Sequence, residues 1–171
     1  NRREHLTVSL VGYTNAGKST LMRALTGADV YVADKLFATL DTTTRRLRFP
    51  EEREIVIADT VGFIENLPDT LAAAFKSTLE ELEEADLLLH VLDASEPDVI
   101  HQHRAVLEVL GALHLLETPQ TLVWNKADAT HPEILASLVE QHGGIAVSAL
   151  TGEGLPALLE QIERTLFRSA A

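Results

Sequence analysis

Residues 12–19 read GYTNAGKS, which fits the phosphate-loop pattern G-x-x-x-x-G-K-[ST]. The apolar run LTVSLV at 6–11 precedes this loop and predicts a strand, while TLMRALT at 20–26 follows it and predicts a helix that ends before Gly27. A strand, a glycine-rich loop and a helix in this order distinguish a phosphate-binding loop from a glycine-rich turn before an ordinary helix. The glycines let backbone N–H groups converge on phosphate oxygens, and the helix N-terminus adds positive potential.

Two side chains of this loop have chemistry that suits a nucleotide. Lys18 can reach the β- and γ-phosphates, and the Ser19 hydroxyl can bind Mg²⁺. The loop therefore predicts a nucleotide site at the carboxyl end of the first strand.

Apolar runs that alternate with helical spacing extend through the rest of the chain. Five further strands are predicted, and the first two of them, separated by only a few turn residues, form a hairpin. Strands that are apolar throughout are typical of a parallel sheet covered on both faces, so the fold class is α/β with a mostly parallel six-stranded sheet. The strands are expected at 46–49, 54–59, 87–92, 121–124 and 145–147, and further helices around 71–82, 99–110 and 155–166.

Composition narrows the class of protein. The chain has 171 residues, 46% of them hydrophobic, which suits one globular domain with a real core. It has no cysteine, which excludes disulfides and thiol chemistry, and no apolar run approaches the length of a membrane span. The net charge of −12 argues against a broad basic face for nucleic acid. Because the chain begins with Asn1 and enters its first strand at once, we expect a domain of a longer protein spanning 1–171.

Three more motifs each follow a predicted strand. In Asp59-Thr60-Val61-Gly62, the Asp can hold a water on Mg²⁺ and the Gly leaves its N–H free for the γ-phosphate, although a strand that ends in Asp-Thr is common. In residues 125–128 (NKAD), Asp128 can accept two hydrogen bonds from guanine, and adenine would leave this carboxylate unpaired. By itself, NKAD is also an ordinary polar turn.

Residues 148–150 (SAL) follow the last strand, and their N–H groups could donate to guanine O6. The alternative is a turn that precedes the last helix. Both interpretations can hold together.

Four such motifs in this order resemble the Ras-like GTPases. The sequences at 12–21 (GYTNAGKSTL), 37–45 (FATLDTTTR) and 59–64 (DTVGFI) are similar to those of the HflX family in the Obg–HflX branch. The resemblance implies a three-layer Ras-like G domain that binds GTP and GDP with Mg²⁺ and hydrolyses GTP in the cytoplasm. It also implies that the full-length protein binds the large ribosomal subunit and splits stalled ribosomes.

The same resemblance makes residues 37–41 the first switch, with Thr39 as a second protein ligand of Mg²⁺. Thr42, Thr43 and Thr44 stay open as alternatives for that ligand, and the threonines could also simply favour an extended segment. The long stretches 28–45 and 60–70 lack periodicity, which is typical of functional loops.

Hydrolysis is expected to be slow, because Phe63 stands where Ras-like proteins carry the Gln that orients the attacking water. Asn15 resembles the Asn with which some GTPases hold a monovalent cation, so K⁺ is a candidate cofactor; the alternative is an Asn that tolerates the turn. Arg45, Arg46 and Arg48 could supply positive charge in cis, and Glu65 could be a catalytic carboxylate, but a solvated edge strand and an exposed carboxylate explain these residues better.

The histidines and the tryptophan are expected to be structural. His90 is expected to be a satisfied core residue in a strand, His101 and His103 are too poorly aligned on a helix for a metal pair, and Trp124 is expected to pack under the base-binding loop.

Two other functions stay open: a docking module with negligible hydrolysis, and a P-loop NTPase that also uses ATP. The expected nucleotide-binding residues are Gly12, Tyr13, Thr14, Asn15, Ala16, Gly17, Lys18, Ser19, Thr20, Phe37, Ala38, Thr39, Leu40, Asp41, Asp59, Thr60, Val61, Gly62, Asn125, Lys126, Ala127, Asp128, Ser148, Ala149 and Leu150; the catalytic ones are Lys18, Thr39, Gly62 and Asn15, and the Mg²⁺ ligands Ser19, Thr39 and, through water, Asp59.

Overall fold

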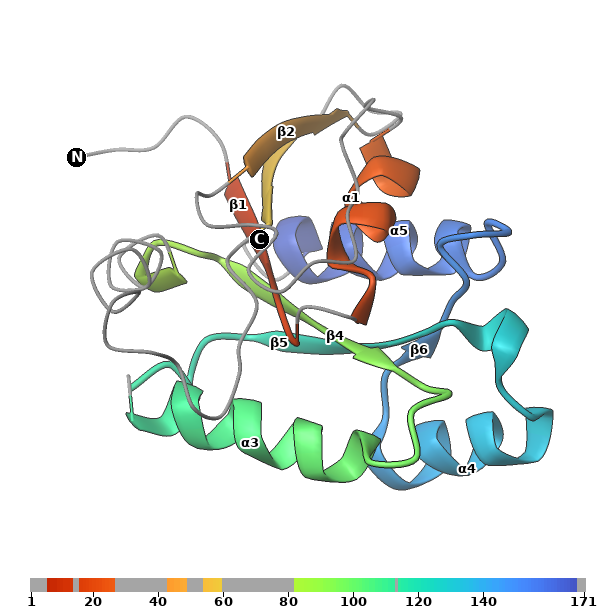
Figure 1. Ribbon diagram of the computed structural model, residues 1–171. Helices are drawn as coiled ribbons and strands as arrows, with labels where there is room; N and C mark the ends of the chain where they lie inside the picture. Colours follow the sequence, from red (N-terminus) through yellow and green to blue (C-terminus); the bar gives the residue numbers. More distant parts are fainter. Residues whose placement is uncertain are drawn as a thin grey trace.

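The computed structural model describes residues 6–13, 16–26, 43–48, 54–59, 82–112 and 114–168. In this part of the chain a six-stranded sheet has the order β2-β3-β1-β4-β5-β6 (Figure 1). Strand β2 pairs with β3 in antiparallel orientation, and all other neighbours are parallel. The predicted sheet and hairpin are therefore confirmed. The strands are β1 Leu6–Val11, β2 Thr43–Arg48, β3 Glu54–Asp59, β4 Leu87–Asp93, β5 Gln120–Asn125 and β6 Ile145–Ala146.

Helices cover both faces of the sheet, as expected for three layers. Helices α1 and α5 lie on one face, and α3 and α4 lie on the other (Figure 1). These helices are α1 Lys18–Thr26, α3 Val99–Ala112, α4 Pro132–His142 and α5 Leu155–Glu163, and α5 continues into a π-helical turn at Arg164–Arg168.

Strand β4 shows how the two cores divide. All seven of its residues are buried. Leu87, Leu89 and Val91 belong to the apolar cluster that contains α1 and α5 side chains such as Leu21 and Leu158. Leu88 packs instead with Val106 and Leu110 of α3. Alternate residues point to opposite faces of a strand, so a continuous apolar run is what a strand between two helical layers requires.

Helix α4 was not predicted from the sequence. Its boundaries carry ordinary signals: Pro132 stands in the first turn, the His131 ring accepts from the Glu133 N–H at 3.2 Å, and Gly143 follows the last residue with a φ of 79°. Of the helix predicted around 71–82, only Leu82 is described, and it is helical together with Glu83. Strand β6 stops one residue earlier than predicted, although the Val147 N–H still donates to the Trp124 carbonyl of β5.

His90 does not have the partners expected of a satisfied core histidine. It is fully buried in β4, and neither ring nitrogen has a hydrogen-bond partner among the described residues. Its ring lies 5.1 Å from that of His103 on α3, which in turn lies 5.6 Å from His142 at the end of α4. Trp124, buried as predicted, contacts the rings of His103 and His142. We call these four residues the histidine cluster.

Burial, and to a smaller extent the neighbouring His103, lower the pKa of His90 to about 3. The pKa of His103 is also lowered, first by burial and then by His142 and Arg104. At neutral pH, His90 and His103 are therefore uncharged rings in the layer between the sheet and helices α3 and α4.

No helix in the described ranges is long and apolar enough to cross a bilayer.

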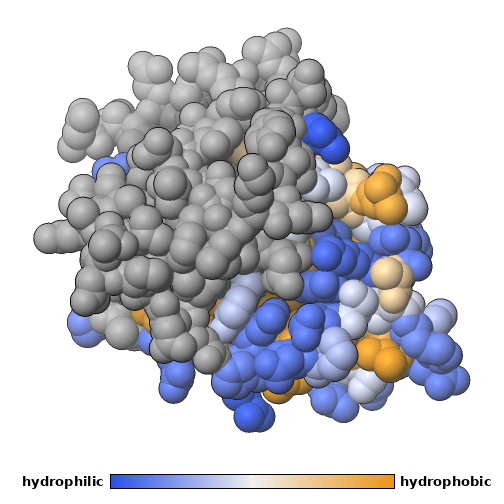
Figure 2. Space-filling model, viewed as in Figure 1, coloured by the Kyte–Doolittle hydropathy of each residue, from blue (hydrophilic) through white to orange (hydrophobic). Residues whose placement is uncertain are grey.

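The visible surface of the described residues is mostly hydrophilic, with apolar side chains scattered among polar ones (Figure 2). The large apolar residues exposed in the described part are Leu116, Ile134 and Leu150. Of these three, Leu150 lies beside the expected site.

Candidate functional site

The phosphate loop follows β1 directly. Gly12, with a φ of 148°, lies so close to β4 that a Cβ at this position would stand 2.4 Å from the Val91 carbonyl oxygen. Ala16 donates its N–H to the Tyr13 carbonyl at 3.1 Å, and this hydrogen bond joins the two described sides of the loop. The sequence GYTNAGKS therefore places the loop tightly against the sheet before helix α1 begins.

Helix α1 begins at Lys18, followed at once by Ser19. Lys18 is only 4% exposed, and such burial is unusual for lysine unless its charge is balanced. At the first turn of a helix, N–H groups point outward and the potential is positive. A buried ammonium together with a helix N-terminus makes this end of α1 suitable for an anion such as a phosphate.

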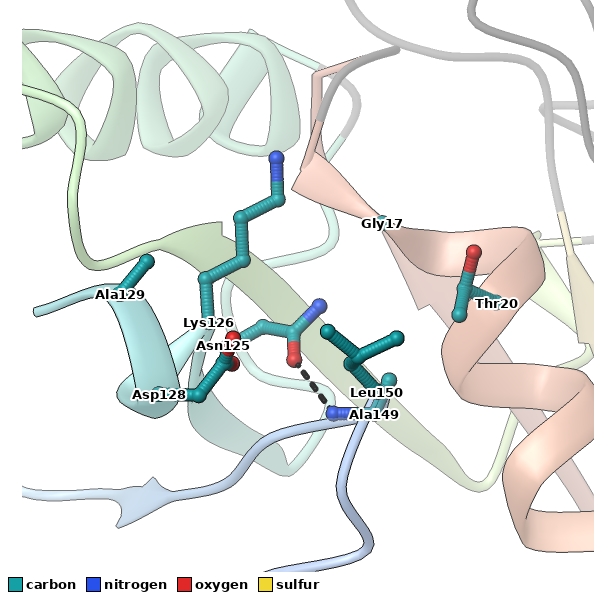
Figure 3. A pocket seen from close by; sticks show the side chains of 8 residues that line it. All are labelled: Gly17, Thr20, Asn125, Lys126, Asp128, Ala129, Ala149 and Leu150. Carbon is teal, nitrogen blue, oxygen red and sulfur yellow. Dashed lines mark hydrogen bonds between the residues drawn. The ribbon is translucent and has the colours of Figure 1, made fainter.

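Asn125, the last residue of β5, connects three loops. It is 2% exposed. Its Nδ2 donates to the Ala16 carbonyl at 3.0 Å, and its Oδ1 accepts from the Ala149 N–H at 3.0 Å. Both ends of the amide are thus used to hold the phosphate loop and the loop after β6 at the same edge of the sheet. Figure 3 shows the bond to Ala149. Gly17 is required beside it, because a Cβ there would lie 2.5 Å from Asn125 Nδ2.

Asp128 lies in the short 3-10 turn Ala127–Ala129 after Lys126. Its Oδ1 accepts from the Ser148 hydroxyl at 2.7 Å, and Ser148 Oγ accepts in turn from the Thr151 N–H at 3.0 Å. Ser148 is fully buried whereas Asp128 is exposed. The serine therefore fixes the direction of a carboxylate that still faces solvent.

These elements border a cavity of about 160 Å³. We call this cavity the base slot. Figure 3 shows Lys126, Asp128 and Ala129 on one side of it, with Thr20 and Gly17 across from them. The Leu150 side chain, 79% exposed, lies at its rim. The slot is lined by Gly17, Thr20, Asn125, Lys126, Asp128, Ala129, Ala149 and Leu150.

The structure brings together most of the predicted residues that it describes. Gly12, Tyr13, Ala16–Thr20, Asn125–Asp128 and Ser148–Leu150 gather at the carboxyl edge of the sheet. Asp59, of which only the backbone is described, ends β3 and pairs with Leu10 of β1 at that edge. The predicted residues outside the described part are Thr14, Asn15, Phe37, Ala38, Thr39, Leu40, Asp41, Thr60, Val61, Gly62 and Phe63.

A magnesium ion would find some of its expected donors here. The Ser19 hydroxyl lies in the first turn of α1, and β3 delivers Asp59 to the neighbouring strand end. Hydroxyl and carboxylate oxygens are the ligands that Mg²⁺ prefers. In the described ranges no three or more His, Cys, Asp or Glu residues form a protein-only metal site.

One residue at this edge was not predicted from the sequence. Asp93 ends β4, pairs in register with Asn125, and contacts Lys126. A carboxylate directly after a fully apolar strand, at the edge where the other motifs lie, was the available signal.

Comparison with known proteins gives a consistent result. The sequence profile of the family described as "50S ribosome-binding GTPase" matches residues 7–126. The chain is 55% identical over 161 residues to a GTPase HflX of Caldanaerobacter subterraneus subsp. tengcongensis, covering 94% of this chain but 37% of that protein. The similarity to HflX expected from the motifs is confirmed, and the chain spans less than two fifths of that relative.

Solved structures agree with the fold. A variant of Aquifex aeolicus Era bound to GDP·AlF4⁻ superposes with a TM-score of 0.79 at 28% identity, covering 94% of this chain and 56% of that one. Era in complex with MgGDPNP and nucleotides 1506–1542 of 16S ribosomal RNA also gives 0.79, at 27% identity over 96% of this chain and 57% of that one. With its Ras-like fold, its motif order and the profile match, the chain belongs to the family of 50S ribosome-binding GTPases.

Proposed function

We propose that this domain binds GTP and GDP, with the guanine in the base slot and the phosphates at the start of α1. The observation that carries the proposal is the fixed Asp128 carboxylate, held by Ser148 at the open side of the slot. A carboxylate so placed accepts from N1–H and the 2-amino group of guanine. Adenine offers neither donor, so it would desolvate the carboxylate without giving it a partner from the base.

Hydrolysis of GTP is part of the proposal. Lys18 and the first turn of α1 stabilise charge on the β- and γ-phosphates, and Ser19 holds Mg²⁺ together with Asp59 through water and Thr39. The Thr39 hydroxyl and the Gly62 N–H sense the γ-phosphate, and the loops that contain them relax after it leaves. Support for Mg²⁺ and for hydrolysis comes from the related Era, solved with MgGDPNP and with GDP·AlF4⁻.

The intrinsic rate is proposed to be slow, because the Phe63 ring cannot orient water. Asn15 is proposed to hold K⁺ beside the phosphates, which would supply positive charge in the absence of an arginine finger. Faster phosphate release in potassium than in sodium buffer supports this role, whereas equal rates overturn it.

The proposed partner is the large ribosomal subunit. A longer chain that contains this domain is proposed to bind this subunit and to split ribosomes. The proposed location is the cytoplasm, where ribosomes work. The support is the family membership and the HflX relative. A docking module with negligible hydrolysis is the competing function that Phe63 favours. Multiple-turnover phosphate release, with and without ribosomes, separates the two: turnover in either condition supports the enzyme.

Asp128→Asn tests the base assignment most sharply. Asn presents a donor where xanthine carries an acceptor, so the variant should lose guanine nucleotide affinity and gain affinity for xanthine nucleotides. Removing two hydrogen bonds to guanine in a largely desolvated site should weaken GDP binding about 100-fold. Glu153→Gln is the matched control, because it removes an exposed carboxylate near the same loop that does not line the slot. Unchanged GDP binding by the Asp128 variant would overturn the assignment.

A further inference from the structure

Lys126 lies beside the base slot in a defined backbone conformation. Its φ and ψ of 65° and 37° are left-handed, which is uncommon for a residue other than glycine. The Thr130 hydroxyl and the Ala129 N–H both donate to its carbonyl, at 2.8 and 3.0 Å. The backbone of Lys126 is therefore fixed, whereas the torsions of its long side chain need a further restraint.

The Lys126 side chain lies along the slot. Figure 3 shows it extended toward the segment that contains Gly17. A Cβ placed on Gly17 would lie 4.0 Å from Lys126 Cε, an ordinary van der Waals distance. The methylenes thus form one apolar wall, and this wall is complete only while the side chain stays extended.

Asp93 holds the far end of this side chain. Its Oδ2 lies 3.2 Å from Lys126 Nζ, and the aspartate side chain is 9% exposed against 41% for the lysine. Its other oxygen, Oδ1, accepts from the Ser95 N–H at 2.9 Å and from the Ser95 hydroxyl. The Asp93 carboxylate is thus oriented by Ser95 of its own loop, independently of its contact with Lys126.

The same loop is tied to the end of β5. Asp93 pairs in register with Asn125, and the Ala94 N–H donates to the Asn125 carbonyl at 2.9 Å. The carboxylate and the lysine therefore start from neighbouring strands at fixed positions. An ion pair with one partner fixed and nearly buried loses less side-chain entropy than an exposed pair of two free side chains.

We propose that Asp93 is a positioning residue for guanine nucleotide binding, which acts by holding the Lys126 side chain extended along the base slot, with Ser95 orienting the carboxylate. This inference rests on the proposed function, because it assumes that a guanine nucleotide occupies the slot. Asp93 is not among the residues that line the base slot. Its effect should therefore be the same for GDP and GTP, and should be absent from the chemical step.

The direct test is Asp93→Asn in the full chain, with GDP and GTP affinities measured by calorimetry. The isosteric amide keeps an acceptor for Ser95 but lacks the charge that holds the ammonium. We expect both nucleotides to bind about 5-fold more weakly, as for a partly buried ion pair. Under single turnover at saturating GTP, the hydrolysis rate should stay at the wild-type value while half-saturation moves to higher GTP. Glu96→Gln is the control, since it removes a carboxylate from the same loop without a contact to Lys126; its affinities should match those of the wild type.

A double-mutant cycle with Lys126→Met separates positioning from a general effect on the loop. Methionine keeps an unbranched apolar chain but has no charge for Asp93 to hold. In the Lys126→Met background, Asp93→Asn should change the GDP affinity less than about 1.5-fold, because no partner is left to couple with. Ser95→Ala gives a second route that leaves the ion pair itself in place: we expect about a 2-fold decrease in affinity with Lys126 present, and none in the Lys126→Met background.

Three results would overturn the inference while leaving the proposed function intact. The first is an Asp93→Asn affinity equal to that of the wild type. The second is an equal decrease in affinity whether Asp93→Asn is made in the wild-type or in the Lys126→Met background. The third is a slower single-turnover rate with unchanged half-saturation. A wild-type chain that binds no guanine nucleotide would overturn the proposed function and this inference together.

Discussion

The base slot and the histidine cluster share strand β5, through Asn125 and Trp124, yet their buried polar groups differ in hydrogen bonding. In the slot, Asn125 is buried with both amide atoms bonded, and Ser148 is buried while it donates to Asp128 and accepts from Thr151. In the cluster, His90 is buried with no hydrogen-bond partner for either ring nitrogen among the described residues.

Buried polar groups therefore fix the local structure where they are hydrogen-bonded, and do not fix it where they lack partners. A fully bonded buried network resists rearrangement, because breaking any bond leaves a desolvated group. An unbonded buried ring costs stability and restrains its neighbours little. We therefore expect substitutions in the slot to reduce nucleotide binding, and substitutions in the cluster to change stability.

Asn125→Ala should give the largest effect. It removes both bonds that tie the phosphate loop to the loop after β6, and leaves the Ala16 carbonyl and the Ala149 N–H without this partner. We expect GDP affinity to fall by about 100-fold or more, from two buried hydrogen bonds. Calorimetry with GDP and Mg²⁺ measures the change.

Gln141→Ala is the matched control for Asn125→Ala, because it removes an exposed amide that donates to Ser137 within α4. Its GDP affinity should equal that of the wild type. A decrease for Asn125→Ala smaller than about threefold would mean that the network does not organise the slot.

Two glycines of the loop after β6 give the next largest effect. Both have a left-handed φ, 80° at Gly154 and 90° at Gly152, so Ala is strained at either position. At Gly154 the added Cβ would also lie 2.3 Å from the Ala146 carbonyl oxygen, whereas at Gly152 nothing lies within 4 Å.

Gly154→Ala should therefore lower the free energy of unfolding by about 3 kcal/mol, and Gly152→Ala by about 1 kcal/mol. Urea denaturation of the two variants measures the difference. Equal losses of stability would show that the loop can move to accommodate the added methyl group at no cost in free energy. The slot would then be less rigid than its hydrogen bonds indicate.

The histidine cluster should make stability depend on pH. Burial lowers the pKa of His90 from 6.5 to about 3. Between these values the unfolded chain binds a proton that the folded chain does not, so stability falls as pH falls from 6.5 toward 3. The slope is about 1.4 kcal/mol per pH unit for one group.

His90→Leu should remove this dependence, so that the variant loses about 2 kcal/mol less than the wild type between pH 7 and pH 5. Part of the acid loss remains, because burial also lowers the pKa of His103. His101→Gln, exposed on α3 and outside the cluster, should leave the acid loss in place. Parallel stability curves for wild type and His90→Leu would contradict the account of the cluster.

The sequence predicted those parts of the molecule that depend on local pattern. Largely apolar runs predicted five of the six strands, because a strand covered on both faces is apolar along most of its length. The arginine-rich β2 (TTRRLR) begins at Thr43, three residues before its predicted start. GYTNAGKS, NKAD and SAL marked the strand ends that meet at the slot. Helix α4 was not predicted, although Pro132 and Gly143 bracket it.

Contacts between distant segments could not be predicted in this way. The bond from Asn125 to Ala16 joins residues 109 apart, and the pairing of Asp93 with Lys126 depends on the register of two strands. For His90, the pattern of β4 indicated burial, but its neighbours on α3 and α4 are set by helix packing that no local pattern encodes.

The most direct test of the central claim is calorimetry on nucleotide-free protein with Mg²⁺, titrated with GDP, GTP and ATP. We expect saturable heat with both guanine nucleotides and none with ATP at the same concentration, because adenine lacks the N1–H and 2-amino donors that guanine offers to Asp128. Equal binding of ATP, or no heat with guanine nucleotides, would contradict the claim.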